Sequence, residues 1–352
     1  MRTPHRATGM TLIELMISMT ILIFVVAMTV TIVLAAVFVS RRGQEISDAN
    51  EASRMAGDTV VNAIQGAGLG MSQGLYVSYA GVIVRTSPVI IVNNTNAPDE
   101  LWVVRAHRNA LLQSCVDEGA ATTIQKSGFG AIFARCSGGL TAAGLSGAGL
   151  TAAQTLLMAT NMTSGALLST PVFTTSGAGQ SLGFAESGVA GFADHPQRGF
   201  QKGDLVMPVK VEHYFIALSN GVPSLMMEPG VIGTVANGFV AAGTPRLIQS
   251  GVEDMQLSVG IDTGQTGDPA NITWSNTAVG PAFVTGLRSI RVSILSLSAR
   301  TILGTDGRVL LTAEYSPRTL EDHVVTAPVA DGRRRTLYAR RVELVNLAAG
   351  DL

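Results

Sequence analysis

The sequence has little charge, few aromatic residues and almost no cysteine. Only 14% of its 352 residues are charged, against about 25% in an average soluble domain. The formal net charge is −1, whereas a dedicated nucleic-acid-binding domain has an excess of basic residues. Two cysteines are too few for a scaffold built on disulfides. Disorder is also excluded, because 47% of the residues are hydrophobic and disordered chains combine few apolar residues with high net charge.

The hydrophobic residues are concentrated in one run near the N-terminus. Residues 15–39 contain no charge and no proline, and Arg41 and Arg42 follow them. A helix needs about 20 apolar residues to cross the hydrocarbon core of a bilayer, so a run of 25 residues is long enough. No later stretch is comparable. The sequence therefore predicts a single-pass membrane protein with a transmembrane segment at about 15–39.

A short motif precedes this run. A secretory signal places its cleavage site after the apolar region, whereas here the small residue Gly9 lies before it. The segment Gly9–Glu14 reads Gly-Met-Thr-Leu-Ile-Glu, which closely resembles the type IV prepilin signature. In that family a prepilin peptidase cuts after the glycine and methylates the new N-terminal amine. The resemblance implies a leader at 1–9, cleavage between Gly9 and Met10, and N-methylation of Met10.

Glu14 lies at the edge of the apolar run, five positions into the expected mature chain. An isolated acid within the membrane costs about 2.5–3.5 kcal/mol on insertion scales, so it needs a partner. The resemblance implies one, the positive amine of Met10 on a neighbouring subunit, and this pair would set the axial register between helices in a fibre. Thr11 and Glu14 are therefore the expected subunit-assembly residues. The alternative is an acid that reaches the membrane interface beside a helix N-terminus.

The helical pattern continues beyond the membrane run. Small and apolar residues recur every three or four positions from Ile46 to Ala67, and the glycine-rich segment Gly66–Gly70 is typical of a helix end. We therefore expect one helix over 10–66. Gly43 and Gly57 are expected weak points, because glycine costs about 1 kcal/mol relative to alanine in a helix. The first half of the helix would lie in lipid or in a fibre core, and the second half would pack under a head.

The remainder of the chain, 67–352, is typical of a β-rich head. Segments rich in Val, Ile and aromatic residues predict antiparallel strands with one face on the helix. The expected strands are Tyr76–Val92, Leu101–Ala106, Asp204–Leu218, Arg246–Asp262, Leu287–Ala299 and Arg335–Leu347. The fold class expected from these patterns is therefore α+β, and the resemblance to type IV prepilins implies a type IV pilin-like arrangement: a long N-terminal helix, transmembrane in its first half, packed on a β-rich antiparallel-sheet head.

One segment of the head has no assignable pattern. Residues 136–185 contain no charge and are rich in Gly, Ala, Ser and Thr. We expect a surface insertion or an unconventional subdomain there, and not a second membrane span, because glycines and hydroxyl residues interrupt it throughout. Cys115 and Cys136 lie close to its start, in a head expected to be periplasmic, where disulfides persist. A disulfide between them is expected, with two free thiols as the alternative.

The C-terminal half narrows the family. Several segments resemble PilW-family minor pilins: 202–206, 213–215, 246–262, 287–297 and 334–346, together with the end-of-helix segment 62–69. The resemblance implies a low-abundance pilin that joins other minor pilins and the major pilin in the bacterial inner membrane and starts pilus assembly. A place at the pilus tip and contact with a tip adhesin are further candidates. The head would lie in the periplasm, and then at the cell surface in the pilus fibre.

Other functions stay open at this point. The minor pseudopilin J of type II secretion shares this layout, and a pilus-borne module that binds surfaces or DNA would use the head. The candidate DNA contact is the basic cluster Arg333, Arg334, Arg335, Arg340 and Arg341. A charged edge strand that resists aggregation explains this cluster better, and nucleic acid is not expected as a partner.

No catalytic, cofactor or metal site is expected, and the chain is not expected to be an enzyme. Residues 70–74 match the esterase string Gly-x-Ser-x-Gly, but that elbow requires a strand before the serine and a helix after it. Here a helix precedes the serine. Asp262 and Asp268, with glycines between them, are a candidate calcium loop, for which a solvated hairpin turn is the preferred interpretation. The histidines show no metal-ligand spacing.

Overall fold

The computed structural model shows one long helix followed by a head of β-strands. It describes residues 11–72, 74–79, 82–106, 112–113, 133–134, 156–162, 164–168, 171–176, 179–184, 205–232, 239–264, 268–276, 284–298, 319–324, 333 and 335–348. Gly9, Met10, Cys115 and Cys136 lie outside these residues. The cleavage site, the N-methylation and the disulfide therefore stay predictions.

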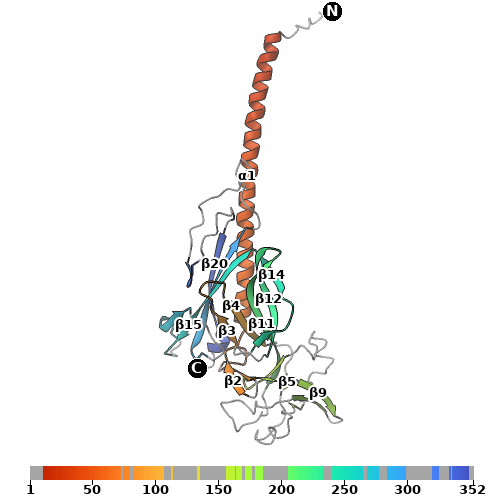
Figure 1. Cartoon of the computed structure of the whole chain (residues 1–352), viewed down its shortest axis with the longest axis vertical. Coiled ribbons are helices and arrows are strands. Elements are labelled where there is room, and N and C mark those ends of the chain that lie inside the picture. The colour runs from red at the N-terminus through yellow and green to blue at the C-terminus, as the bar shows by residue number, and fades with distance from the viewer. Residues whose placement is uncertain are drawn as a thin grey trace, which may run out of the picture.

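Helix α1, Leu12–Gln65, is continuous over 54 residues, which makes it about 81 Å long at 1.5 Å per residue. Thr11 caps its N-terminus and Gly66 its C-terminus. The helix projects far beyond the head, and its N-terminal end lies at the opposite end of the molecule from strand β9, Pro171–Ser176 (Figure 1). The long N-terminal helix expected from the sequence is therefore present, and it begins and ends within two residues of the expected bounds.

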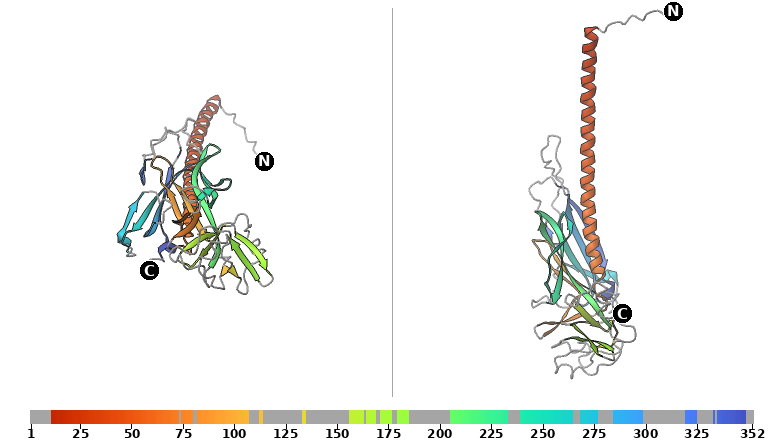
Figure 2. Two further views of the ribbon diagram at one scale, coloured as in Figure 1. Left: turned by 60° about the horizontal axis from the view of Figure 1, so that its bottom comes forward. Right: turned by 90° about the vertical axis from the view of Figure 1, so that its right-hand side faces the viewer.

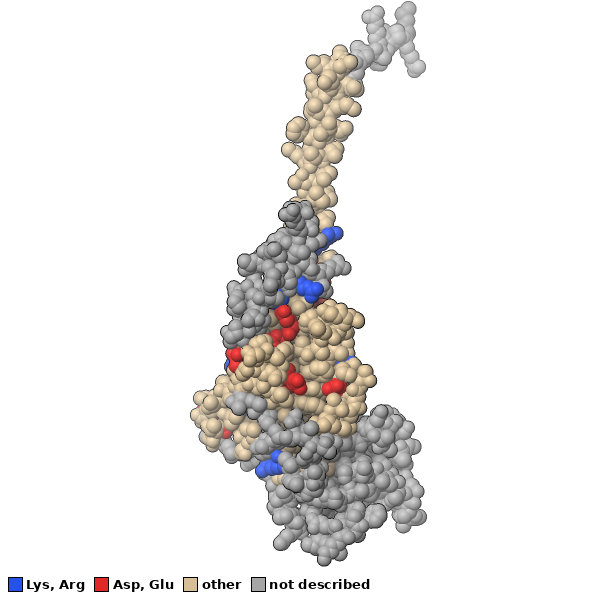
Figure 3. Space-filling model, viewed as in Figure 1, with Lys and Arg blue, Asp and Glu red and all other residues tan. Residues whose placement is uncertain are grey.

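The two halves of α1 have different surroundings. In the first half the large apolar side chains are exposed, and buried positions begin only at Glu45 and continue to Ile64. In Figure 3 the first half of the helix shows an uncharged surface, whereas charges are scattered over the head. Among the described residues, α1 is the one helix that is long and apolar enough to cross a membrane. Because such a surface is unfavourable in water, it fits a membrane anchor.

The head consists mainly of antiparallel strands. Their bounds are β1 Leu75–Tyr79, β2 Val82–Thr86, β3 Val89–Val92, β4 Glu100–Ala106, β5 Leu112–Gln113, β6 Phe133–Ala134, β7 Leu156–Thr160, β8 Gly165–Leu168, β9 Pro171–Ser176, β10 Gly179–Phe184, β11 Leu205–Ser219, β12 Val222–Ile232, β13 Phe239–Ala241, β14 Arg246–Ser250, β15 Val252–Asp262, β16 Ile272–Ser275, β17 Leu287–Leu297, β18 Thr319–Leu320, β19 His323–Val324 and β20 Arg335–Glu343. A 3₁₀ turn, η1 Pro269–Asn271, precedes β16, and a short helix, α3 Val345–Ala348, follows β20.

Two sheets build most of the head. The larger has 11 strands with the central order β13-β12-β11-β7-β8-β1-β2, and β14, β3, β4 and β5 pair beside this path. The pair β1–β8 is parallel. The second sheet has the order β16-β15-β17-β20. Two smaller sheets, β6-β10-β9 and β18-β19, complete the described head, and β9 and β10 lie at the end of the head farthest from the N-terminus (Figures 1 and 2).

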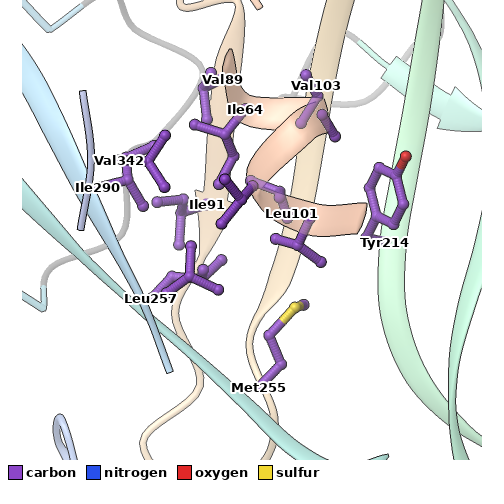
Figure 4. Close-up of a cluster of buried hydrophobic side chains, with 14 of the residues drawn as sticks. Ile64, Val89, Ile91, Leu101, Val103, Tyr214, Met255, Leu257, Ile290 and Val342 are labelled. Carbon is purple, nitrogen blue, oxygen red and sulfur yellow. The ribbon is translucent and has the colours of Figure 1, made fainter. Parts of the chain in front are cut away.

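The main core lies where the second half of α1 meets both large sheets (Figure 4). Ile64 of α1 is fully buried in one cluster with Val89 and Leu101 of the 11-stranded sheet and with Ile290 and Val342 of the four-stranded sheet. Each such side chain contributes about 1.5–3 kcal/mol on full burial. The α+β, pilin-like fold class predicted from the sequence is confirmed: an apolar helix whose second half packs on a β-rich head.

Several expected strands differ in detail. The segment predicted as one strand at Tyr76–Val92 forms β1, β2 and β3, and Pro88, which has no N–H to donate to a ladder, lies between the last two. The predicted strand Arg246–Asp262 is divided at Gly251, whose φ of 80° interrupts the extended backbone. The uncharged segment contains β7 and β8, which pair with β11 and β1. That part of the segment therefore belongs to the main sheet and is not an insertion beside it.

Candidate assembly site

The start of α1 carries a complete capping box formed by Thr11 and Glu14. The Thr11 backbone N–H donates to Glu14 Oε2 at 2.9 Å, and the Thr11 hydroxyl donates to the same oxygen at 3.0 Å. In return, the Glu14 N–H donates to Thr11 Oγ1 at 3.4 Å. Two N–H groups that a helix start leaves unpaired are thus satisfied reciprocally. The two predicted assembly residues that the structure describes are therefore in direct contact.

The Glu14 carboxylate remains available for a further partner. Both Thr11 and Glu14 are exposed, and among the described residues Thr11 is the one hydrogen-bond partner of Glu14. The second oxygen of the carboxylate has no bond to a described residue. The carboxylate also lies at the positive end of a long helix dipole, which favours its charged form. This arrangement can accept a hydrogen bond from a cationic group while the capping box stays closed.

A set of contacts fixes the second half of α1 on the head. The Tyr338 hydroxyl of β20 donates to Asp58 Oδ1 at 3.0 Å, and Arg340 Nη1 lies 3.6 Å from the same oxygen. Gly57 lies against the Tyr338 ring, because a Cβ built there would be 2.3 Å from Tyr338 Cε1. At Gly57, α1 therefore comes close to the Tyr338 ring of β20. The prediction of a weak point in the helix did not include this contact. These contacts join the second half of α1 to β20 of the head.

The sequence reasoning missed a polar ladder in the 11-stranded sheet. His213 of β11 lies between two carboxylates: its Nδ1 is 2.8 Å from Glu228 Oε1 on β12, and its Nε2 is 3.0 Å from Glu100 Oε2 on β4. The imidazole also stacks on Trp102, with ring centroids 4.0 Å apart. The hydrogen bond from His213 lowers the pKa of Glu100, against the effect of its partial burial. The ladder links three neighbouring strands.

A second missed group joins the two large sheets. Asp99 precedes β4, and its two carboxylate oxygens accept the N–H groups of Asn94 and of Leu257 on β15, each at 2.8 Å. Nearby, His323 Nδ1 lies 2.8 Å from Asp254 Oδ2. Burial raises the pKa of Asp99 to about 7, and the negative charges of Asp322 and Asp254 add to this shift. The contacts of Asp99 are structural, since both of its oxygens are used by backbone donors.

The candidate esterase string and the candidate calcium loop both lie in turns of the backbone. Residues 70–72 form a turn after α1 with Gly70 at φ 75°, and β1 follows, which is the reverse of an esterase elbow. Asp262 Oδ1 accepts the N–H of Gly264 at 3.2 Å, and Asp268 caps the η1 turn. The described residues contain no group of three or more His, Cys, Asp or Glu side chains that could hold a metal ion.

The described arginines of the basic cluster point in different directions. Arg335 makes two hydrogen bonds to Glu253, at 2.6 and 3.0 Å, and Arg340 faces Asp58 of α1. Arg341 lies on the opposite face of β20, as strand alternation requires. Among the described strands, β20 is at the edge of its sheet, which agrees with the charged-edge interpretation.

Comparisons with known proteins find a family match for part of the head. Residues 213–346 match the family model described as Type IV Pilus-assembly protein W, PilW. This segment of the chain is PilW-like. The matched segment runs from β11 to α3 and includes the whole four-stranded sheet that packs on α1. A type IV-like pilin from Thermus thermophilus is similar at a TM-score of 0.33 and 11% sequence identity, over 88% of this chain and 98% of that chain. No curated protein matches the chain.

The resemblance to PilW that the C-terminal half predicts is confirmed. The match of residues 213–346 to a pilus-assembly family supports a pilus-related role and association with other pilus components.

Proposed function

We propose that this PilW-like chain is a minor type IV pilin that takes part in the initiation of pilus assembly. The observation that supports the proposal is the first half of α1, an apolar helix with no described residue packed on it and with Glu14 at its start. Such a helix is satisfied in lipid, and it is equally satisfied among other apolar helices. It can therefore move from the membrane into a bundle of pilin helices without a large change in solvation.

With the capping box, Glu14 would have a role both in the membrane and in the assembled bundle of helices. In the membrane the Thr11 N–H and hydroxyl satisfy one carboxylate oxygen, which lowers the cost of keeping an acid at the edge of the hydrocarbon. In the assembly the other oxygen would receive the amine of Met10 from a neighbouring subunit. That amine exists only after a prepilin peptidase has cut between Gly9 and Met10, so processing would precede assembly.

The head supplies the contacts that would distinguish this subunit from the others. In the proposed arrangement it lies in the periplasm, beside the heads of other minor pilins and of the major pilin, and it reaches the cell surface with the fibre. A place at the tip, next to a tip adhesin, would follow if this subunit joins first and later subunits are added at the membrane.

The experiment that tests this function is affinity capture of the full-length chain from membranes solubilised in mild detergent. We expect minor pilins and the major pilin to be recovered with the wild-type chain and to be reduced with a Glu14→Ala chain. Recovery of type II secretion pseudopilins in place of pilus subunits would contradict the proposal and assign the chain to the secretion system.

A further inference from the structure

The outer face of the four-stranded sheet, which points away from α1, carries a cluster that the proposed function does not use. Strand register places one row of side chains across β15, β17 and β20, and the next row across β16, β15 and β17. The first row is Ser258, Arg291 and Arg341, and the second is Trp274, Gly260 and Ser289, which continues to Glu343 on β20. Direct cross-strand partners share a face, with Cβ atoms about 4.5–5.5 Å apart. We call Ser258, Ser289, Arg291 and Arg341 the arginine–serine cluster.

The two arginines of this cluster are directly opposite each other, and like charges in that position repel. Their side chains are 41% and 39% exposed. Glu321 Oε2 lies 3.5 Å from Arg291 Nη1, and Glu343 Oε1 lies 3.6 Å from Arg341 Nη2. Both distances exceed the 2.7–2.9 Å of a close charge-assisted hydrogen bond. Because a guanidinium carries five N–H donors, these two carboxylates use only a small part of what the arginine pair offers.

The two serines of the cluster are buried beside the arginines. Ser258 and Ser289 are 1% and 0% exposed, and neither hydroxyl has a hydrogen-bond partner among the described residues. A buried hydroxyl without a partner is unfavourable, so two of them on neighbouring positions of one face are unusual for a purely structural surface. Each hydroxyl has one hydrogen to donate. Within the described part of the head, this face therefore presents two unpaired hydroxyl donors next to two guanidinium groups.

The Trp274 ring lies across this face. The Cζ atoms of Arg291 and Arg341 are 4.4 and 5.6 Å from the ring centroid, within the range of cation–π attraction. Gly260 leaves room for the ring, since a Cβ there would be 3.3 Å from Trp274 Cη2 and 2.6 Å from Ser289 Oγ. Trp274 is carried by β16, a strand of four residues that, among the described strands, pairs with β15 alone. The Trp274 ring, which lies beside Gly260 and against both arginines, is thus attached to a short strand at the edge of the sheet.

We propose that the arginine–serine cluster binds an oxyanion, a carboxylate or phosphate group, that bridges Arg291 and Arg341 and accepts hydrogen bonds from the hydroxyls of Ser258 and Ser289 when the Trp274 ring moves aside. The planar fork of an arginine matches the geometry of both anions. Binding would remove the repulsion between the arginines and would satisfy the two hydroxyls. It would also move Trp274 out of its contact with Arg291.

The test is a titration of the full-length chain in detergent with inorganic phosphate and, separately, with glutarate, at constant ionic strength set with chloride. Heat of binding is measured by calorimetry, and tryptophan fluorescence reports the movement of Trp274. We expect saturable binding of at least one of the two anions. Tighter binding of phosphate would indicate a phosphate ligand, and tighter binding of glutarate would indicate a carboxylate ligand. Arg341→Gln should weaken this binding at least tenfold. The double substitution Ser258→Ala and Ser289→Ala should also weaken it at least tenfold while the chain stays folded, because it removes only unpaired hydroxyls.

Arg340→Gln is the matched control. Arg340 is the neighbour of Arg341 on the same strand and is 53% exposed, but it faces Asp58 on α1, so this variant should bind the anion as the wild type does. Three results would each overturn the proposal: no saturable binding of phosphate or glutarate, an equal loss of binding in Arg340→Gln and Arg341→Gln, or unchanged binding in the double serine variant.

Discussion

Glu14 is an acid at the start of an apolar helix, and its two oxygens have different surroundings. One accepts two hydrogen bonds from Thr11, and the other has no described partner. Glu14→Ala removes the acceptor for the Met10 amine and leaves the residues on both sides of the cleavage site unchanged. We therefore expect normal removal of the leader and at least a tenfold loss of surface pili in a strain that carries only the variant, measured by mass spectrometry of the chain and by counting of fibres.

Thr11→Ser is the matched control for this prediction. It keeps the N–H and the hydroxyl that cap Glu14 and removes only a methyl group, so pili should form as in the wild type. A Glu14→Ala strain with normal numbers of fibres would show that the carboxylate has no part in assembly.

Asp99 is a second residue that leads to a prediction, which concerns the pH dependence of folding stability. Its pKa is raised to about 7 in the folded chain, against about 3.9 in an unfolded one. The protonated form is thus favoured by folding, so the contribution of Asp99 to stability is greatest below pH 4, decreases as the pH rises from about 4 to about 7, and is constant above that. In that range the free energy of unfolding decreases by at most about 1.4 kcal/mol per pH unit through this group.

Asp99→Asn removes this titration while it keeps the size of the side chain. The amide loses one acceptor and leaves one of two buried N–H groups unpaired, so the variant should be less stable by about 1–3 kcal/mol at pH 5. The difference between variant and wild type should shrink at pH 8, because only the wild type loses stability as the pH rises. Chemical denaturation of both chains in detergent at the two pH values measures this. A difference that stays the same at pH 5 and pH 8 would mean that Asp99 does not titrate in this range.

Within the helix, the two glycines Gly43 and Gly57 form a matched pair, because the same substitution meets different surroundings. A Cβ at Gly57 would lie 2.3–2.6 Å from three atoms of the Tyr338 ring, whereas one at Gly43 has nothing within 4 Å. Gly57→Ala must displace the ring and should destabilise the chain by about 1–3 kcal/mol. Gly43→Ala should stabilise it by up to about 1 kcal/mol, through helix propensity alone.

Thermal unfolding of the two variants in the same detergent measures this difference. The Gly57→Ala chain should also lose the hydrogen bond between Tyr338 and Asp58, so adding Tyr338→Ala to it should cost less than Tyr338→Ala costs in the wild type. Equal shifts in the melting temperatures of Gly43→Ala and Gly57→Ala would show that the ring adapts freely and that α1 is not fixed at this point.

The elements also show what the sequence can and cannot predict. Helix α1 was predictable because its apolar run and its later pattern of small residues are local. Strand β12 was missed, although Asn220 and Gly221 have φ of 50° and 76° and form the two-residue turn that an Asn-Gly pair favours. Recognition of that hairpin would have paired His213 with Glu228, since both are equally distant from the turn.

Other features have no local sequence signature. Asp99 bonds to Leu257, 158 positions away, and β8, which lies within the uncharged segment, pairs in parallel with the distant strand β1. Contacts of this kind depend on how whole sheets come together on α1. Within the candidate site, the Gly9–Glu14 motif was found by resemblance, and the Thr-x-x-Glu capping box is a local pattern, whereas the fixing of α1 by Tyr338 depends on the assembled sheet.

On the scale of the whole molecule, the proposed removal of the leader would decide whether the chain can enter a fibre. Removal of residues 1–9 takes away two arginines and changes the formal net charge from −1 to −3. It also creates the amine at Met10 that would pair with Glu14 of a neighbour. With the leader attached, a charged segment would stay in front of an apolar helix that must pack among other apolar helices, which is costly for arginine in a nonpolar environment.

Gly9→Arg should block cleavage, because a long charged side chain replaces a residue with none at the bond to be cut. We expect the variant to remain in the membrane, since residues 15–39 are unchanged, with a mass that still includes the nine leader residues and without incorporation into pili. Membrane extraction, mass spectrometry and immunodetection on sheared fibres measure these three properties separately. Ala7→Ser, a small change within the leader, is the control that should be processed normally. A Gly9→Arg chain of mature size would contradict the predicted cleavage site, and an uncleaved chain found in fibres would contradict the requirement for a free amine at Met10.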